Sequence, residues 1–197
     1  WGLSMNLPNK LTMFRIILIP FFILILAAPI FSGSVVIAGT SISVTRLVAT
    51  IIFIVASLTD FLDGQIARRN HLVTNFGKFA DPLADKMLVM TAFLFLVGLG
   101  DVPAWVAAII VCRELAVTGL RLIIVENEGQ VIAAAWPGKI KTTTQMLAII
   151  LLFLNNVLFA AIKVPMGLIL LYICLFFTIY SGVDYFVQNR SVFSDSF

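Results

Sequence analysis

Long apolar stretches alternate with short polar connections along almost the whole chain. A transmembrane helix needs about 20 mostly apolar residues to cross the hydrocarbon core of a bilayer. Six stretches are close to that length or longer, and several of the connections contain Gly or Pro, which interrupt helices. The pattern predicts an all-α integral membrane protein, a six-transmembrane-helix bundle with spans at residues 11–29, 43–69, 78–99, 103–126, 139–161 and 164–188.

The residues before the first predicted span have a different pattern. Leu3–Asn9 is polar at one end and apolar at the other, which is typical of a short helix that lies along the membrane interface. Residues 1–4 precede Met5, and we interpret them as a possible cloning remnant, which leaves 5–197 as a single membrane domain. No small-residue cleavage signature follows the first apolar stretch, so we expect a retained span and not a signal peptide.

The lysine and arginine residues indicate the orientation of these spans. Cytoplasmic loops of membrane proteins carry an excess of both residue types. Arg46 and Lys163 fall near one side and Arg113 lies inside a span, whereas the others share the side of both termini. We therefore predict a multi-pass cell-membrane protein with both termini cytoplasmic. The basic residues on that side are Lys10, Arg15, Arg68, Arg69, Lys78, Lys86, Arg121, Lys139, Lys141 and Arg190.

Composition supports the membrane and argues against nucleic acid as a partner. Of the 197 residues, 61% are hydrophobic and 12% are charged, and the mean hydropathy is +1.09; a soluble domain needs a more polar surface. The net charge of +3 is not gathered into a long basic run, so a nucleic-acid site is not indicated. Cys112 and Cys174 lie in apolar stretches without metal-ligand spacing, and we expect both to be buried.

Four of the ten acidic residues lie at the expected cytoplasmic ends of the second and third spans. Asp60 and Asp63 are three residues apart and Asp81 and Asp85 are four apart, so each pair shares one helical face. If these spans are antiparallel neighbours, both pairs point at one place, where they repel one another unless cations lie between them. Carboxylate oxygens favour Mg²⁺ or Mn²⁺, and four of them suit two ions.

Small and basic residues beside these carboxylates admit two interpretations. Gly64 and Ala67 leave room for a flat ligand to approach the backbone, and small residues also serve close helix packing. Arg68 offers a planar fork of donors to a phosphate. Alternatively, the four Asp residues are ordinary helix-end charges that pair with Arg68, Arg69 or Lys78. Their facing helical spacings beside small residues favour the metal site.

The run from Asp60 to Asp85 resembles the signature of the CDP-alcohol phosphotransferases at every fixed position. It reads Asp-x2-Asp-Gly-x2-Ala-Arg-x8-Gly-x3-Asp-x3-Asp, eight defined residues at five defined spacings. The resemblance implies that Asp60, Asp63 and Asp81 hold the metal and the CDP diphosphate. It further implies that Asp85 helps to bind the metal and acts as the base on the acceptor hydroxyl.

The same resemblance implies a nucleotide site. Gly64 and Ala67 match positions that line the cytidine pocket, and Arg68 matches a position near the phosphates. Gly77 of the signature and two residues of the N-terminal segment complete this prediction. The predicted CDP-binding residues are Asp60, Asp63, Gly64, Ala67, Arg68, Gly77, Asn9 and Thr12.

Three further segments resemble the phosphatidylglycerophosphate synthases within that family. Leu7–Arg15 is similar to their "PN-x-LT-x2-R" opening, Cys112–Arg121 to their "RE…V-x-G-x-R" segment, and Gly138–Gln145 to their "GK-x-KT…Q" start of the fifth span. The chain is also about as short as those enzymes. Since the signature alone does not choose the acceptor alcohol, these segments carry the prediction of the acceptor.

The basic residues of these segments suggest a pocket for an anion. A phosphorylated acceptor needs such a pocket, whereas serine or choline does not. The alternative for the residues at the span ends is the positive-inside rule or contact with lipid headgroups. The alternative for Arg113 is an ion pair with the adjacent Glu114. The predicted acceptor phosphate-binding residues are Arg113, Arg121, Lys139, Lys141 and Thr142, with Gln145 as a further neutral donor.

Together the resemblances imply a Mg²⁺- or Mn²⁺-dependent enzyme that moves the phosphatidyl group of CDP-diacylglycerol to glycerol 3-phosphate. They also imply a homodimer among the lipids of a bacterial plasma membrane, with the active site on the cytoplasmic side. The same chemistry with phosphatidylglycerol or an inositol phosphate as acceptor stays open. A small membrane transporter is a remote alternative, because intramembrane carboxylates occur there too.

Overall fold

The structure is a computed structural model that describes residues 6–28, 30–69, 75–126 and 136–190. These residues form six long helices, one short helix and a two-stranded sheet. The helices are α1 (Leu7–Ala27), α2 (Val44–Arg69), α3 (Asn75–Gly98), α4 (Ala104–Glu126), α5 (Trp136–Phe153), α6 (Val157–Ala160) and α7 (Met166–Gln188), and the strands are β1 (Ser34–Ile37) and β2 (Thr40–Ser43). The helical fold class is thus confirmed for the described residues.

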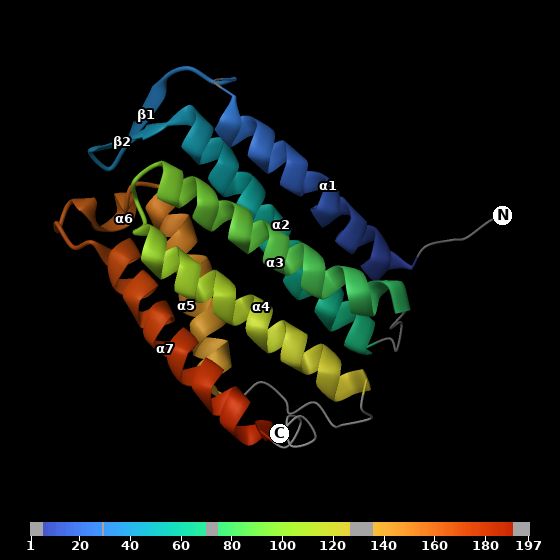
Figure 1. Cartoon of the computed structure of the whole chain (residues 1–197). Helices are drawn as coiled ribbons and strands as arrows, with labels where there is room; N and C mark the ends of the chain where they lie inside the picture. Colours follow the sequence, from blue (N-terminus) through green and yellow to red (C-terminus); the bar gives the residue numbers. More distant parts are fainter. Residues whose placement is uncertain (1–5, 29, 70–74, 127–135, 191–197) are drawn as a thin grey trace.

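The long helices run alongside one another in a bundle (Figure 1). The strands and α6 lie at one end, which we call the hairpin end, and α1 begins and α2 terminates at the opposite end, which we call the motif end. Helix α1 packs along α2 and α3, and α7 packs along α5 and α4. This arrangement matters for function, because the predicted Asp residues of α2 and α3 then share the motif end.

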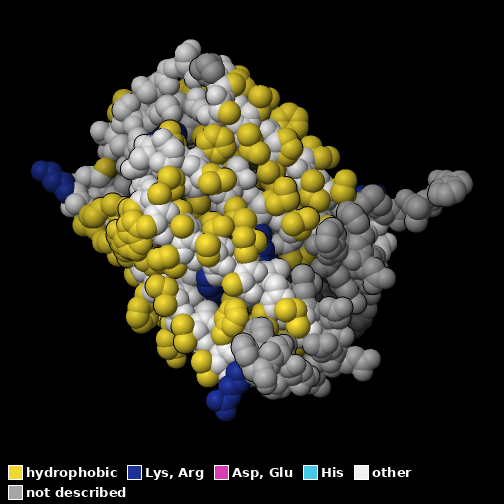
Figure 2. All heavy atoms as spheres, in the orientation of Figure 1, with side chains coloured by type: hydrophobic (Ala, Val, Ile, Leu, Met, Phe, Trp, Pro, Cys, Tyr) yellow, Lys and Arg dark blue, Asp and Glu magenta, His cyan; other side chains and the backbone are white. Residues whose placement is uncertain are grey.

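The surface of the bundle carries many apolar side chains. Hydrophobic side chains are spread over much of the described face in Figure 2, with Lys and Arg at only a few places on it. Two of the described helical segments, Asn9–Ala27 and Met166–Gln188, are long and apolar enough to cross a membrane. At 1.5 Å per residue, the 23 residues of α7 extend about 34 Å, slightly more than the roughly 30 Å of a hydrocarbon core.

A β-hairpin occupies a connection for which the sequence predicted no secondary structure. Strand β1 pairs antiparallel with β2, and Ile37 lies opposite Thr40. The two residues between them, Ala38 and Gly39, have φ angles of 49° and 79°. Two successive positive φ angles are typical of a type I′ turn, whose twist matches that of the flanking strands. The β-branched run before Gly39 favours the strand, a signal that lay within an otherwise apolar sequence.

The fifth helix is shorter than predicted. We expected a span over 139–161, whereas α5 ends at Phe153. Asn155 and Asn156 follow with φ angles of 51° and 56°, a left-handed conformation that ends a helix. The side chain of Asn156 donates to the carbonyl of Val164 and accepts from the amide of Gly167 at 3.1 Å. These bonds join the end of α5 to the start of α7, so the prediction of one continuous span was wrong here.

The N-terminal segment also differs from its prediction. Residues 1–5 lie outside the described residues, and Leu7–Asn9, expected along the membrane interface, form the first turn of α1 itself. Pro8 in that turn is compatible with a helix start, since its missing amide has no helical acceptor there. One of the two cysteines was also predicted wrongly: Cys174 is buried as expected, whereas Cys112 is exposed on α4.

The aromatic core lies toward the hairpin end and leaves the motif end for polar residues. The ring of Phe22 in α1 lies 6.3 Å from Phe53, 6.4 Å from Phe95 and 5.8 Å from Phe153, between ring centroids. These four rings join α1, α2, α3 and α5. Close to them, Arg46 pairs with Asp101 at 2.6 Å between Nη2 and Oδ2. The hairpin end is therefore held by both apolar packing and an ion pair.

Candidate active site

Helix α1 contacts both halves of the aspartate motif. Arg15 Nη1 lies 2.7 Å from Asp60 Oδ1 of α2, and the Arg15 side chain is completely buried. Thr12, one turn earlier on the same face of α1, donates a hydrogen bond from its hydroxyl to Asp81 Oδ1 of α3. Asn9, a further turn earlier, is also buried. The N-terminal helix thus fixes two of the predicted metal ligands.

Three carboxylates of the motif are described, and they do not form a ready metal site, since no three His, Cys, Asp or Glu side chains among the described residues are grouped closely enough to hold an ion. Asp60 lies within electrostatic reach of Asp81, and Asp85 lies within reach of Asp60. Asp81 and Asp85 share one face of α3, because they are one turn apart. Their oxygen donors fit a hard divalent cation such as Mg²⁺ or Mn²⁺, which relieves the repulsion between neighbouring carboxylates. The side chain of Asp60 is 38% exposed, so this carboxylate is accessible to a ligand.

Some predicted residues cannot be placed by their side chains. Their backbone belongs to the last turns of α2 or the first turns of α3. Beyond this backbone, the structure does not describe them. The predicted site residues concerned are Asp63, Gly64, Ala67, Arg68 and Gly77.

A narrow cavity joins Asp85 to the predicted acceptor pocket. It measures about 50 Å³ and lies between α3, α4 and α5. Asp85 lines it from α3, Glu114 from α4, and Lys141, Thr142 and Gln145 from α5. The structure therefore brings the predicted base and two of the predicted phosphate-binding residues to one space. A small acceptor that enters this cavity meets a carboxylate from α3 and cationic and neutral donors from α5.

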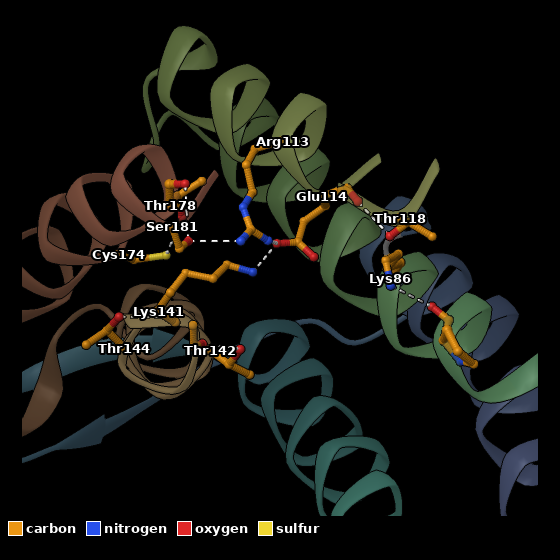
Figure 3. A network of polar contacts seen from close by, with 12 residues as sticks. Lys86, Arg113, Glu114, Thr118, Lys141, Thr142, Thr144, Cys174, Thr178 and Ser181 are labelled. Carbon is orange, nitrogen blue, oxygen red and sulfur yellow. Dashed lines mark hydrogen bonds and ion pairs between the residues drawn. The ribbon is translucent and has the colours of Figure 1, made fainter. Parts of the chain in front are cut away.

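A network of polar contacts lies beside this cavity, around Glu114 and Lys141 (Figure 3). Glu114 Oε1 accepts from Arg113 Nη1 at 3.2 Å and also from Lys141 Nζ. Arg113 Nη2 donates to Ser181 Oγ of α7 at 2.9 Å. Lys141 is only 5% exposed, so its charge is balanced by Glu114 inside the bundle. The ion pair between Arg113 and Glu114, which the sequence left as an alternative, is present.

Two of the predicted phosphate-binding residues lie away from this network. Lys139 and Arg121 are both exposed. The ammonium group of Lys139 lies 5.2 Å from the ring centroid of Trp136, and the guanidinium of Arg121 lies 5.9 Å from that of Tyr185. Both distances are typical of cation–π contacts. Residues 121 and 139 are thus at the surface of the bundle, whereas Lys141, two residues along α5, is inside it.

Sequence reasoning did not select several residues that the structure places at the site. Arg15 was placed on the cytoplasmic side and in the "PN-x-LT-x2-R" segment but was given no role at the site, although a charge three residues after Thr12 in an apolar span is a signal that the two share a face. Lys86 lines the cavity next to Asp85. Ser181 gave no signal, because its hydroxyl reaches Arg113 only through the packing of α7 on α4.

Comparisons with known proteins agree with the signature. A family model described as CDP-alcohol phosphatidyltransferase matches residues 5–180. A CDP-diacylglycerol–glycerol-3-phosphate 3-phosphatidyltransferase of Bacillus subtilis (strain 168) is 48% identical over 184 residues, which cover 93% of this chain and 95% of the relative. A relative of that name from Haemophilus influenzae is 38% identical over 93% of this chain and 92% of its own length. A probable phosphatidylglycerophosphate synthase of Mycobacterium tuberculosis is 42% identical over 91% of this chain and 79% of its own length.

Proposed function

The chain belongs to the CDP-alcohol phosphatidyltransferase family, and from this premise we propose that it transfers the phosphatidyl group of CDP-diacylglycerol to glycerol 3-phosphate. The products are phosphatidylglycerophosphate and CMP. The names of full-length relatives support this acceptor over phosphatidylglycerol or an inositol phosphate. The observation that carries the proposal within the structure is a cavity that Asp85 and Lys141 both line.

The motif end of α2 and α3 binds the donor in this proposal. Asp60, Asp63, Asp81 and Asp85 would hold Mg²⁺ or Mn²⁺, in a site of two ions. Bound cations neutralise the diphosphate and stabilise the departing CMP. Arg15 and Thr12 orient Asp60 and Asp81, because each makes a direct contact with one of these carboxylates. The CDP moiety lies against the predicted nucleotide residues, which are Asn9, Thr12, Gly64, Ala67, Arg68 and Gly77.

Asp85 acts as the general base. It takes the proton from the attacking hydroxyl of glycerol 3-phosphate, whose oxygen forms a bond to the β-phosphorus of CDP-diacylglycerol. The bond from that phosphorus to the oxygen of CMP breaks, and CMP leaves with the electron pair. The proton then passes from Asp85 to water. Phosphoryl-type transfer depends mainly on in-line positioning and charge stabilisation, so no covalent enzyme intermediate is needed.

The acceptor is held at two points. Lys141 and Thr142 bind its phosphate on the α5 side of the cavity, with Arg113 behind Glu114 as a second cation. The hydroxyl then lies toward Asp85 on α3. Fixing both ends of a short molecule lowers the entropy lost on reaching the transition state. Arg121 and Lys139, at the surface of the same end, attract the anionic substrates toward the cavity.

The proposal includes six membrane spans formed by the long helices, with the motif end and both termini in the cytoplasm of a bacterial cell. The support is the distribution of charge. Arg46 and Lys163 are at the hairpin end, whereas most of the other basic residues belong to chain segments at the motif end. A membrane-level site lets the donor keep its two acyl chains in the bilayer while CMP and glycerol 3-phosphate exchange with water. Family resemblance supports a homodimer.

The reaction is tested by measuring CMP release from purified protein in detergent. CDP-diacylglycerol is supplied with Mg²⁺ and one acceptor at a time: glycerol 3-phosphate, phosphatidylglycerol or an inositol phosphate. We expect release only with glycerol 3-phosphate, its loss in EDTA, and its return with excess Mg²⁺ or Mn²⁺. Release with another acceptor alone would overturn the assigned acceptor. Release that persists in EDTA would overturn the metal requirement.

A further inference from the structure

Residues of helix α7 contact the side chain of Arg113 and hold it in place, although no residue of α7 belongs to the family signature. Arg113 projects from α4 toward α7, and Figure 3 shows it between Glu114 and Ser181. Its Nη2 atom donates to Ser181 Oγ at 2.9 Å, and its Nη1 atom donates to Glu114 Oε1 at 3.2 Å. Ser181 is 8% exposed, so this hydroxyl does not face bulk solvent. The guanidinium is therefore held from both sides.

The residue after Ser181 leaves the room that Arg113 occupies. Gly182 is buried, and a Cβ atom added there would lie 3.1 Å from Arg113 Cγ and 3.6 Å from its Nε. The first distance is shorter than an ordinary carbon–carbon contact. The absence of a side chain at 182 thus lets the aliphatic stem of Arg113 lie against the backbone of α7. The hydroxyl at 181 and the space at 182 define one orientation for the arginine.

This orientation is transmitted to the cavity. Arg113 and Lys141 share the Glu114 carboxylate, and Lys141 and Glu114 line the cavity that also contains Asp85. If the guanidinium turns away, Glu114 loses one of its two cationic partners and the position of its carboxylate changes. The Lys141 ammonium, which is bonded to the same oxygen, then changes with it. Networks of charged groups in a low-dielectric interior are coupled in this way.

We propose that Ser181 and Gly182 are positioning residues for the acceptor phosphate, because they orient Arg113 and, through Glu114, Lys141. This inference rests on the proposed function and extends its acceptor site to α7. The donor site is at the other side of the cavity, on α1, α2 and α3. Substitutions at 181 and 182 should therefore change the KM for glycerol 3-phosphate and leave the KM for CDP-diacylglycerol unchanged.

The test compares Ser181→Ala with Ser181→Thr, which keeps a hydroxyl. We expect Ser181→Ala to raise the KM for glycerol 3-phosphate about tenfold, since hydrogen bonds to charged groups are among the stronger ones. The KM for CDP-diacylglycerol stays unchanged. Competitive inhibition by inorganic phosphate against glycerol 3-phosphate weakens by a similar factor. Ser181→Thr restores most of the affinity for both anions.

A matched control lies one turn earlier on α7. Thr178 is also buried, and its hydroxyl contacts Cys174 Sγ at 3.7 Å and has no contact with Arg113 among the described hydrogen bonds. Thr178→Ala removes a buried hydroxyl from the same helix, and we expect both KM values to stay at the wild-type level. Gly182→Ala supplies an independent change, whose added methyl group displaces the arginine and raises the KM for glycerol 3-phosphate alone.

The outcomes separate this inference from the proposed function. Suppose that the wild-type protein uses glycerol 3-phosphate and that Ser181→Ala leaves both the KM and the inhibition by phosphate unchanged. This result would overturn the positioning role of α7 and leave the proposed reaction in place. Equal effects of Ser181→Ala and Thr178→Ala also overturn it, because they indicate general packing. A wild-type protein without activity toward glycerol 3-phosphate overturns the proposed function itself. If Ser181→Ala does not purify as folded protein, Gly182→Ala decides between these outcomes.

Discussion

Arg15 of α1 and Asp60 of α2 form an ion pair whose two halves differ in exposure. The Arg15 side chain is completely buried and the Asp60 side chain is 38% exposed, with 2.7 Å between Nη1 and Oδ1. The arginine therefore approaches from inside the bundle and leaves the other side of the carboxylate open for a ligand. This geometry makes Arg15 an orienting partner of a predicted metal ligand.

Replacing Arg15 by methionine should impair both activity and stability. Loss of a partner that orients a metal ligand typically costs about 10–100-fold in metal affinity or activity. We expect a fall of that size in kcat/KM for CDP-diacylglycerol, with a higher Mg²⁺ concentration needed for half-maximal rate. A matched control is Arg46→Met, which removes the ion pair with Asp101 at the hairpin end. It should lower the Tm without changing the Mg²⁺ requirement, and equal Mg²⁺ requirements in the two variants would contradict the role of Arg15.

The contrast between Lys141 and Lys139 gives a second prediction. Lys141→Met removes a buried cation that lines the cavity. We expect the KM for glycerol 3-phosphate to rise about 10–100-fold, as for the loss of a charged hydrogen-bonding partner. Lys139→Met changes an exposed residue that lies over Trp136, and its effect should stay within about twofold. Steady-state kinetics with varied acceptor distinguishes them; a larger effect at 139 would place the acceptor outside the cavity.

Asp85→Asn tests the assigned base. The amide keeps the size of the side chain but takes up no proton, so we expect kcat for CMP release to fall about 10²–10⁴-fold. Asp184 offers a matched control, because its carboxylate accepts from Gln188 at 2.8 Å on α7 and has no assigned role in the reaction. Asp184→Asn removes the same charge and should leave kcat unchanged. An Asp85→Asn variant that retains a wild-type kcat would remove Asp85 from the mechanism.

The hairpin turn gives a prediction about stability alone. Ala38 adopts a φ of 49°, which costs a residue with a Cβ about 1–2 kcal/mol. Asparagine tolerates this conformation and is preferred before glycine in a type I′ turn. Ala38→Asn should therefore raise the Tm by about 2 °C, measured by thermal unfolding in detergent, with unchanged kinetics. Gly39→Ala, at a φ of 79°, should lower the Tm, and a Tm that falls in Ala38→Asn would contradict the turn assignment.

The helices follow from the sequence because apolar runs bounded by Gly and Pro have few alternatives. The end of α5 was missed for the same reason, since apolar residues continue from Val157 to Ile162 and hide the break at Asn155 and Asn156. The hairpin was missed because its strands have four residues each. Hydropathy averaged over the length of a span does not resolve elements that short.

The candidate site likewise has relationships within one helix, which the sequence predicts, and relationships between helices, which it does not. The spacing of Asp81 and Asp85 predicts that they share a face, since that relationship lies within one helix. The meeting of Asp85 with Lys141 depends on how α3, α4 and α5 pack, which no local spacing encodes. Lys139 and Lys141 are two positions apart on α5, and the helical rotation between them puts one outside and the other inside. The role of Ser181 depends on a contact between two helices that are far apart in the sequence, so no sequence pattern predicts it.

The gathering of polar side chains at the motif end has a consequence for the bilayer itself. In the proposed orientation, the donor lipid reacts with its headgroup at the cytoplasmic surface, and the product keeps its acyl chains in the same monolayer. Each turnover then adds anionic charge to that monolayer and none to the opposite one. The two leaflets would diverge in lipid composition as synthesis proceeds. Symmetric growth of the membrane therefore requires a separate process that moves the product lipid, or what is made from it, across the bilayer.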